Sequence, residues 1–99
     1  MKPVIFLPEA EEEMLEAASY YQSQAGGLGN DYLFEVERAV HAIATSPDAW
    51  PILERDLRRR LVRRFPFCVL YKIDPEEIVI IAVAHLRRKP GYWRKRISL

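Results

Sequence analysis

A nearly uninterrupted apolar run, IVIIAVAH at residues 78–85, constrains the fold of this chain more than any other feature. A strand that is apolar on both faces belongs in the buried interior of a sheet. The segment FCVLYKI at residues 67–73 is rich in β-branched and aromatic residues, and the DPEE sequence between the two segments predicts a tight turn. Together they predict an antiparallel strand pair at the centre of the fold.

The remaining segments predict an α+β fold around this pair. Residues 4–7 form a short strand between two prolines, and residues 59–65 alternate charged and apolar residues as a third meander strand. Helical spacing of apolar residues marks 9–24 and a second helix, which Asn30 or Asp31 is expected to cap and SPDAWP to end. The expected order is β-α-α-β-β-β, with a helical hairpin packed on a small, mostly antiparallel twisted sheet. One domain is expected to span residues 1–99.

Charge is divided between the two halves of the chain. Residues 1–50 carry two Lys/Arg and nine Asp/Glu, a net −7, whereas residues 51–99 carry thirteen and five, a net +8. This bipolar pattern predicts an acidic partner or nucleic acid on the basic side. Glu11, Glu12, Glu13 and Glu16 are expected to form the solvated surface of the first helix.

Several classes of protein are disfavoured by what the sequence lacks. The single cysteine, Cys68, rules out an intrachain disulfide and fits a reducing, cytoplasmic setting. No stretch reads as a signal peptide or a membrane span, so no membrane contact is expected. Metal-ligand spacing, glycine phosphate loops and nucleophile motifs are missing, and we therefore expect no metal and no cofactor.

Two basic segments are candidates for binding. The first, RRRLVRRFPF at residues 58–67, is expected to be an edge strand whose arginines form a binding rim, although edge charges can also serve only to prevent aggregation. The second, HLRRKPGYWRKR, spans residues 85–96. There Tyr92 and Trp93 are expected to fold back onto the body and leave the cations of residues 87–89 and 94–96 in water, where arginines beside aromatics grip phosphates or acidic peptides. A solvated tail without function is the alternative.

The strand, the helical hairpin and the meander together resemble the RelE/ParE superfamily of bacterial toxins over nearly the whole chain. The most specific pieces are FPFCVLYKI, IIAVAHLRR and the P-x-x-W pattern of Pro90–Trp93. The resemblance implies the toxic component of a type II toxin–antitoxin module, held inactive by a cognate antitoxin. A homodimer through the helical hairpin also stays open.

The superfamily implies two principal activities. RelE-like members cleave mRNA in the ribosomal A site and typically carry an arginine where this chain has Cys68. A nuclease would then need catalytic His85, Arg64 and Arg87, with Tyr92 as another proton-transfer group.

ParE-like members instead inhibit DNA gyrase without catalysis, and Cys68 favours this activity. A third alternative is a degenerate homologue that only binds its antitoxin. The residues expected to bind target or antitoxin are Arg60, Arg63, Arg64, Arg87, Arg88, Tyr92, Trp93, Arg94 and Arg96. A gyrase inhibitor is expected to stay toxic after His85→Ala and to lose toxicity when truncated after Arg88, whereas a nuclease is expected to depend on His85.

Overall fold

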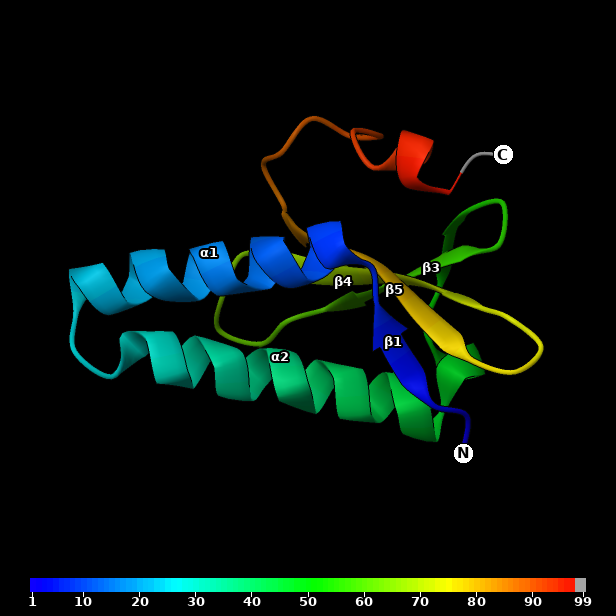
Figure 1. The fold of residues 1–99 in the computed structure, drawn as a ribbon, viewed down its shortest axis with the longest axis horizontal. Helices are drawn as coiled ribbons and strands as arrows, with labels where there is room; N and C mark the ends of the chain where they lie inside the picture. Colours follow the sequence, from blue (N-terminus) through cyan, green and yellow to red (C-terminus); the bar gives the residue numbers. More distant parts are fainter. Residues whose placement is uncertain (98–99) are drawn as a thin grey trace.

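The computed structural model describes residues 1–97 and confirms the predicted α+β architecture (Figure 1). Two long helices, α1 and α2, lie antiparallel, and five strands form one mixed sheet. The elements are β1 Val4–Phe6, α1 Pro8–Gln24, α2 Leu28–Thr45, the 3-10 turn η1 Pro47–Ala49, β2 Ile52–Glu54, β3 Leu57–Leu61, β4 Phe67–Ile73, β5 Ile78–His85 and the 3-10 turn η2 Arg94–Arg96.

The strand order across the sheet is β1-β5-β4-β3-β2. The strand β1 pairs with β5 in parallel, and the other neighbours are antiparallel. The apolar run of β5 therefore lies between two strands, as its composition predicts. The mostly antiparallel sheet is also confirmed.

A β-bulge in β5 changes which face of the sheet successive side chains meet. The register with β4 shifts between Leu70 and Tyr71, so that Leu70 pairs with Ala82 while Tyr71 pairs with Ile80. The extra residue, Ile81, reverses the alternation of side chains along the strand. Ile80 and Val83 consequently pack in one core cluster, and Ile81 packs in the cluster on the opposite face.

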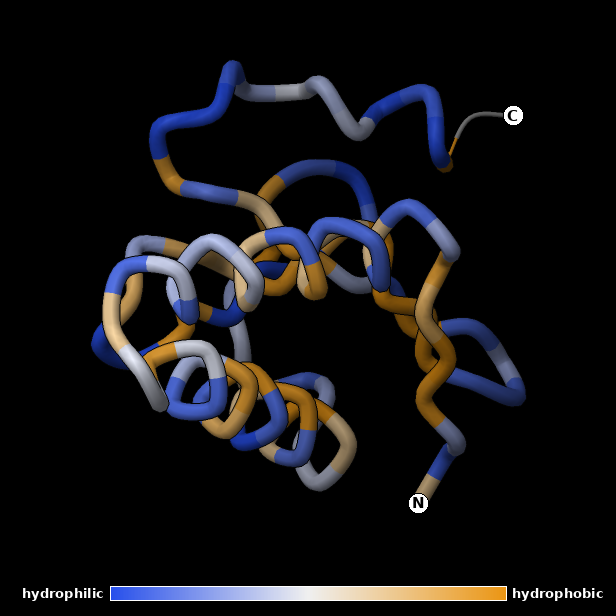
Figure 2. The backbone as a smooth tube through the Cα atoms, turned by 60° about the vertical axis from the view of Figure 1, so that its left-hand side comes forward, coloured by the Kyte–Doolittle hydropathy of each residue, from blue (hydrophilic) through white to orange (hydrophobic). Residues whose placement is uncertain are grey.

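The helical hairpin covers one face of the sheet. Aromatic rings of α1, α2 and β4 meet there, with ring centroids 5.2 Å apart for both Tyr21–Tyr32 and Tyr32–Phe67. The helices approach closely where α2 begins, because a Cβ on Gly29 would lie 2.6 Å from the carbonyl oxygen of Ala18. In Figure 2, apolar residues gather on the sides of the helices that face the sheet.

The opposite face of the sheet is covered by residues 86–97, which we call the C-terminal segment (Figure 1). Trp93 is only 4% exposed and packs in a cluster that includes Leu57 and Leu70, and Tyr92 and Ile97 lie beside it. A sheet needs apolar cover on both faces to bury such side chains. The C-terminal segment is thus part of the core.

Three local predictions were wrong. The second helix begins at Leu28 after Gly27, which has φ +87°, so neither Asn30 nor Asp31 caps it. A short strand, β2, was missed, and it pairs with Leu57 and Arg58, so the first half of β3 is not an edge. The strand β3 also ends at Leu61, because residues 62–66 turn back toward β4 with Arg64 at φ +71°.

Within residues 1–97, neither helix combines the length and the apolar character that crossing a membrane requires.

Candidate functional site

The arginines of β3 alternate between the two faces of the sheet, as the strand period predicts. Arg58 and Arg60 lie on the helix face, where Arg58 donates to the Trp50 carbonyl at 2.7 Å and the Arg60 guanidinium stacks 4.5 Å from the Trp50 ring centroid. Arg60 also donates to the carbonyl oxygen of Leu61. Arg59, on the other face, is exposed and lines a cleft beside the C-terminal segment.

The loop between β3 and β4 carries Arg63 and Arg64, and both are exposed. The guanidinium of Arg64 lies 3.8 Å from the Asp31 carboxylate at the start of α2 and 5.5 Å from the Phe65 ring centroid. This exposed pair is weak, because water and salt screen it. These two arginines belong to the end of the molecule where α2 begins.

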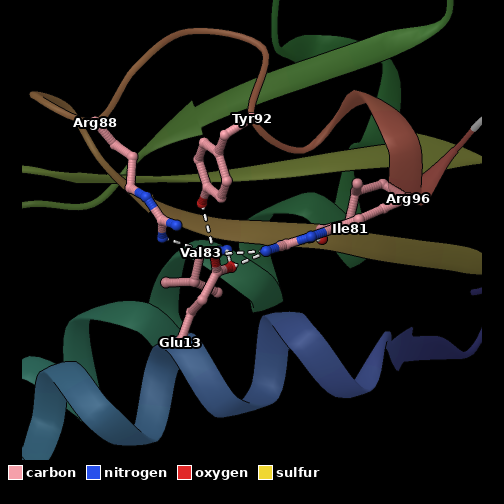
Figure 3. A network of polar contacts seen from close by, with 6 residues as sticks. All are labelled: Glu13, Ile81, Val83, Arg88, Tyr92 and Arg96. Atoms are coloured by element: carbon pink, nitrogen blue, oxygen red, sulfur yellow. Dashed lines mark hydrogen bonds and ion pairs between the residues drawn. The ribbon is translucent and has the colours of Figure 1, made fainter.

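Three predicted binding residues converge on one carboxylate, that of Glu13 on α1 (Figure 3). Arg96 forms a bidentate pair with it, at 2.9 Å for both oxygens. The Tyr92 hydroxyl donates to Glu13 Oε2 at 2.6 Å, and Arg88 Nη1 lies 3.4 Å from the same oxygen. The expectation that Glu13 is solvated was wrong, since its side chain is only 12% exposed.

The Glu13 carboxylate also receives a backbone donor from the sheet. Val83 donates its N–H to Glu13 Oε1 at 3.1 Å, and Arg96 Nη1 donates to the Ile81 carbonyl at 3.1 Å. The strand β1 ends before this point of β5, so these backbone groups have no strand partner on that side. Glu13 and Arg96 therefore satisfy the open edge of β5 beside the bulge.

These contacts fix the protonation states of Tyr92 and Arg96. Burial, followed by the hydrogen bond to Glu13, raises the pKa of the Tyr92 hydroxyl. The hydrogen bond to Glu13 raises the pKa of the Arg96 guanidinium as well. The Tyr92 hydroxyl therefore keeps its proton near pH 7 and donates it in a hydrogen bond, so it is poorly suited to transferring that proton in catalysis.

The rest of the C-terminal segment is partly engaged and partly exposed. Arg94 forms a bidentate pair with Glu54 of β2, at 3.0 and 2.9 Å, and its side chain stays 61% exposed. The expectation that the cations of the segment lie in water was therefore wrong for Arg96, whose side chain is 12% exposed. Arg87, Lys89 and Lys95 are exposed, and among residues 1–97 none of them forms an ion pair.

A cleft of about 230 Å³ separates the sheet from the first part of the C-terminal segment. His85 lines it together with Arg59, Arg88 and Lys89. The His85 Nδ1 accepts the backbone N–H of Arg87 at 3.0 Å, which leaves Nε2 as the ring nitrogen with no partner among residues 1–97. Of the predicted catalytic trio, the described contacts therefore join His85 with the Arg87 backbone, whereas Arg64 contacts α2.

The floor of this cleft includes Cys68, which is 5% exposed. Burial raises the pKa of the Cys68 thiol to about 11, so the side chain is neutral at physiological pH. A neutral thiol offers neither a fixed positive charge nor a reactive thiolate. The cations that line the cleft, Arg59, Arg88 and Lys89, are exposed.

A second depression is apolar and lies where β1 meets the two helices. Its volume is about 500 Å³, and it is lined mainly by apolar side chains, those of Phe6, Met14, Leu15, Leu33, Val36, Val40 and Ala44, together with Glu37 and His41. Leu15 is 53% exposed there. We call this depression the hairpin groove.

Sequence reasoning missed Glu13 as a site residue, and it included Arg59 and Lys89 in the two basic segments without naming them among the contact residues. The helical spacing held one signal for Glu13, because it lies three residues after buried Ala10 and four before Ala17, which packs on the core. For metal binding, residues 1–97 bring together no group of three or more His, Cys, Asp or Glu side chains suited to an ion.

Comparisons with known proteins agree on one family. A model described as "ParE toxin of type II toxin-antitoxin system, parDE" matches residues 4–90. Two Mycobacterium tuberculosis proteins called Toxin ParE2, from strains CDC 1551 / Oshkosh and ATCC 25618 / H37Rv, are each 30% identical to this chain over 89 residues. The match covers 89% of this chain and 85% of theirs.

A solved structure titled "Chromosomal ParDE TA system from P. aeruginosa" has a similar fold. Its TM-score with this chain is 0.66 at 16% identity, and the match covers 88% of this chain and 98% of that one. At this identity the likeness concerns the fold alone.

Proposed function

Because this chain belongs to the ParE toxin family of type II toxin–antitoxin systems, we propose that it stops bacterial growth by poisoning DNA gyrase. The family implies an antitoxin partner, and a cognate antitoxin neutralises the toxin in this proposal. The chain acts in the cytoplasm, binds gyrase on cleaved DNA and performs no catalysis of its own.

The observation that carries this proposal is the state of Cys68. Nuclease members of the superfamily typically hold an arginine at this position, where its charge would stabilise a developing phosphorane. Here the position holds a buried thiol whose pKa is raised to about 11, and the cleft cations Arg59, Arg88 and Lys89 are exposed. A cleft with these residues supports binding to a partner rather than cleavage of a phosphate ester.

The C-terminal segment supplies the contact with gyrase in this proposal. Arg87, Lys89 and Lys95 are exposed and form no ion pair within residues 1–97, so their charge is available to a partner. Arg88 is 53% exposed and can serve both Glu13 and a partner. Arg63 adds a further exposed charge on the loop before β4.

In this proposal the antitoxin fills the hairpin groove and also contacts exposed cationic residues. Apolar side chains of a flexible antitoxin segment fill the groove, and its acidic side chains pair with exposed arginines. The groove supports this because a 500 Å³ apolar depression with a half-exposed leucine gains from being covered. A second copy of this chain in the groove is the other outcome, detectable as a concentration-dependent dimer.

One observation favours ribosome-dependent mRNA cleavage as a second candidate. His85 lies in the cleft with Arg59, Arg88 and Lys89, and its Nε2 has no partner among residues 1–97. Three cations and an imidazole could hold a phosphate and move a proton. In that case His85→Ala lowers the cleavage rate about 10²- to 10⁴-fold.

The decisive experiment is tightly induced expression in a bacterial host, with thymidine and amino-acid incorporation followed in the first minutes. An early stop in DNA synthesis that His85→Ala leaves unchanged, together with inhibition of gyrase supercoiling by the purified protein, supports the proposal. An early stop in protein synthesis that His85→Ala abolishes refutes it in favour of the nuclease. If neither synthesis falls, the chain is a degenerate homologue.

A further inference from the structure

We propose that Glu13 is the positioning residue of the C-terminal segment and sets the geometry in which that segment meets its target. The target part of this inference rests on the proposed function, while the positioning part concerns the chain alone. Glu13 lies on α1, 75 to 83 residues before the three side chains that it holds.

The first argument is the number and kind of donors that meet the carboxylate. Two guanidinium groups, one phenol and one backbone N–H reach it at 2.6–3.4 Å, and two of these donors carry full charge (Figure 3). Hydrogen bonds to ionised groups are stronger than neutral ones, and bidentate arginine pairs also fix direction. The described residues 1–97 contain no other carboxylate that joins α1, β5 and the C-terminal segment.

The second argument is burial. The Glu13 and Arg96 side chains are each only 12% exposed, so water cannot readily replace their contacts. An unpaired charge in such a place is strongly unfavourable. The buried pair of Glu13 and Arg96 therefore favours this one position of the segment.

The third argument is the stacking that Glu13 organises. The Tyr92 ring lies between two guanidinium groups, 3.9 Å from that of Arg88 and 5.1 Å from that of Arg96. All three side chains also bind Glu13, so one carboxylate sets the path of the chain from residue 88 to residue 96. The exposed cations Lys89 and Lys95 lie on this path, and their spacing follows from it.

Glu13 acts through these side chains and not by touching the target. Its carboxylate lies beneath the segment, and its charge is opposite to that of the exposed surface. A partner attracted by cations gains nothing from direct contact with it. Losing Glu13 should therefore alter the target-binding surface while leaving the hairpin groove as it is.

The test compares Glu13→Gln with Glu12→Gln. Glutamine keeps the size and an acceptor for the Val83 N–H but loses the charge that holds Arg88 and Arg96. Glu12 is exposed on the same helix, and its replacement makes the same change in net charge. Position is read from Trp93 emission in a Trp50→Phe background, which removes the other tryptophan, and from trypsin cleavage after Arg87 or Arg88.

We expect Glu13→Gln to shift Trp93 emission to the red and to speed the cleavage on the order of 10- to 100-fold. Gyrase inhibition should weaken by a similar factor, while antitoxin affinity, which also depends on the hairpin groove, should fall by a clearly smaller factor. Adding Arg96→Gln to Glu13→Gln should change little further, because both remove the same contact. Glu12→Gln should match the wild type in every assay.

Emission and cleavage like those of Glu12→Gln would overturn the positioning role. An equal loss of antitoxin affinity would overturn it too, since Glu13 would then support the fold as a whole, and so would additive effects of Glu13→Gln and Arg96→Gln. If the wild-type protein leaves gyrase untouched, the proposed function fails, yet emission and cleavage still decide whether Glu13 positions the segment.

Discussion

Replacing Trp93 by alanine tests whether the C-terminal segment is core. The side chain is 4% exposed and packs on the sheet face opposite the helices. A tryptophan buries roughly 150–250 Å², which at about 25 cal/mol per Å² corresponds to about 4–6 kcal/mol. Partial relaxation and local detachment of the segment lower this value, so we expect Trp93→Ala to reduce the free energy of unfolding by about 3–5 kcal/mol.

The assay is urea unfolding followed by far-ultraviolet circular dichroism, which does not depend on the tryptophan that is removed. Tyr20→Ala is the matched control, because Tyr20 is an aromatic residue 60% exposed on α1 and its loss should cost at most about 0.5 kcal/mol. A loss below about 1 kcal/mol for Trp93→Ala would mean that the second sheet face does not depend on this cover, and the reasoning would be refuted.

Three further predictions concern the body of the fold. Tyr71→Phe removes the hydroxyl that donates to the Pro47 carbonyl at 2.5 Å, and it should lower the free energy of unfolding by about 1–3 kcal/mol in urea titrations. Burial raises the pKa of the folded Cys68 thiol to about 11, so the thiol of the unfolded chain ionises first as the pH rises. The free energy of unfolding should therefore keep its full contribution from this thiol below about pH 9 and should fall as the pH rises toward 11. Urea midpoints measured from pH 8 to 11 should fall less steeply for Cys68→Ala, and equal slopes would contradict this. Gly29→Ala places a Cβ 2.6 Å from the Ala18 carbonyl oxygen, so its thermal midpoint should drop by an amount corresponding to about 1–3 kcal/mol, and an unchanged midpoint would show that the helices can separate freely.

The sequence predicted the architecture because its apolar spacing is clear. The runs at 67–73 and 78–85 are rich in apolar residues on both faces, as only strands in the interior of a sheet are. Both strands begin and end at the residues that the sequence predicted. The hairpin of helices followed from apolar residues at helical spacing with a glycine loop between them. Long periodic segments carry enough signal to be read without tertiary information.

Short elements and tertiary contacts were not predictable in the same way. The strand β2 has three residues, two of them exposed, so its sequence carries no alternation, and only its pairing with β3 makes it a strand. Glu13 stands in an acidic run, and its charge alone suggests a solvated helix face. The side chains that it contacts lie more than 70 residues away, which sequence spacing does not reveal.

The structure also changes how the target-binding surface must be tested. Truncation after Arg88 removes Trp93 and Arg96 along with the exposed cations, and it therefore uncovers the second sheet face and leaves Glu13 without its bidentate partner. Loss of toxicity in that variant would therefore not distinguish a destabilised fold from a lost contact with gyrase.

Point substitutions separate the two effects. Lys89→Gln combined with Lys95→Gln removes two exposed charges that form no ion pair within residues 1–97, so the free energy of unfolding should change by no more than about 0.5 kcal/mol. If the C-terminal segment meets gyrase through its cations, inhibition of supercoiling should weaken on the order of 10-fold and become less sensitive to salt. Unchanged inhibition would remove these two lysines from the contact and leave Arg87, Arg88 and Arg63 as the candidates.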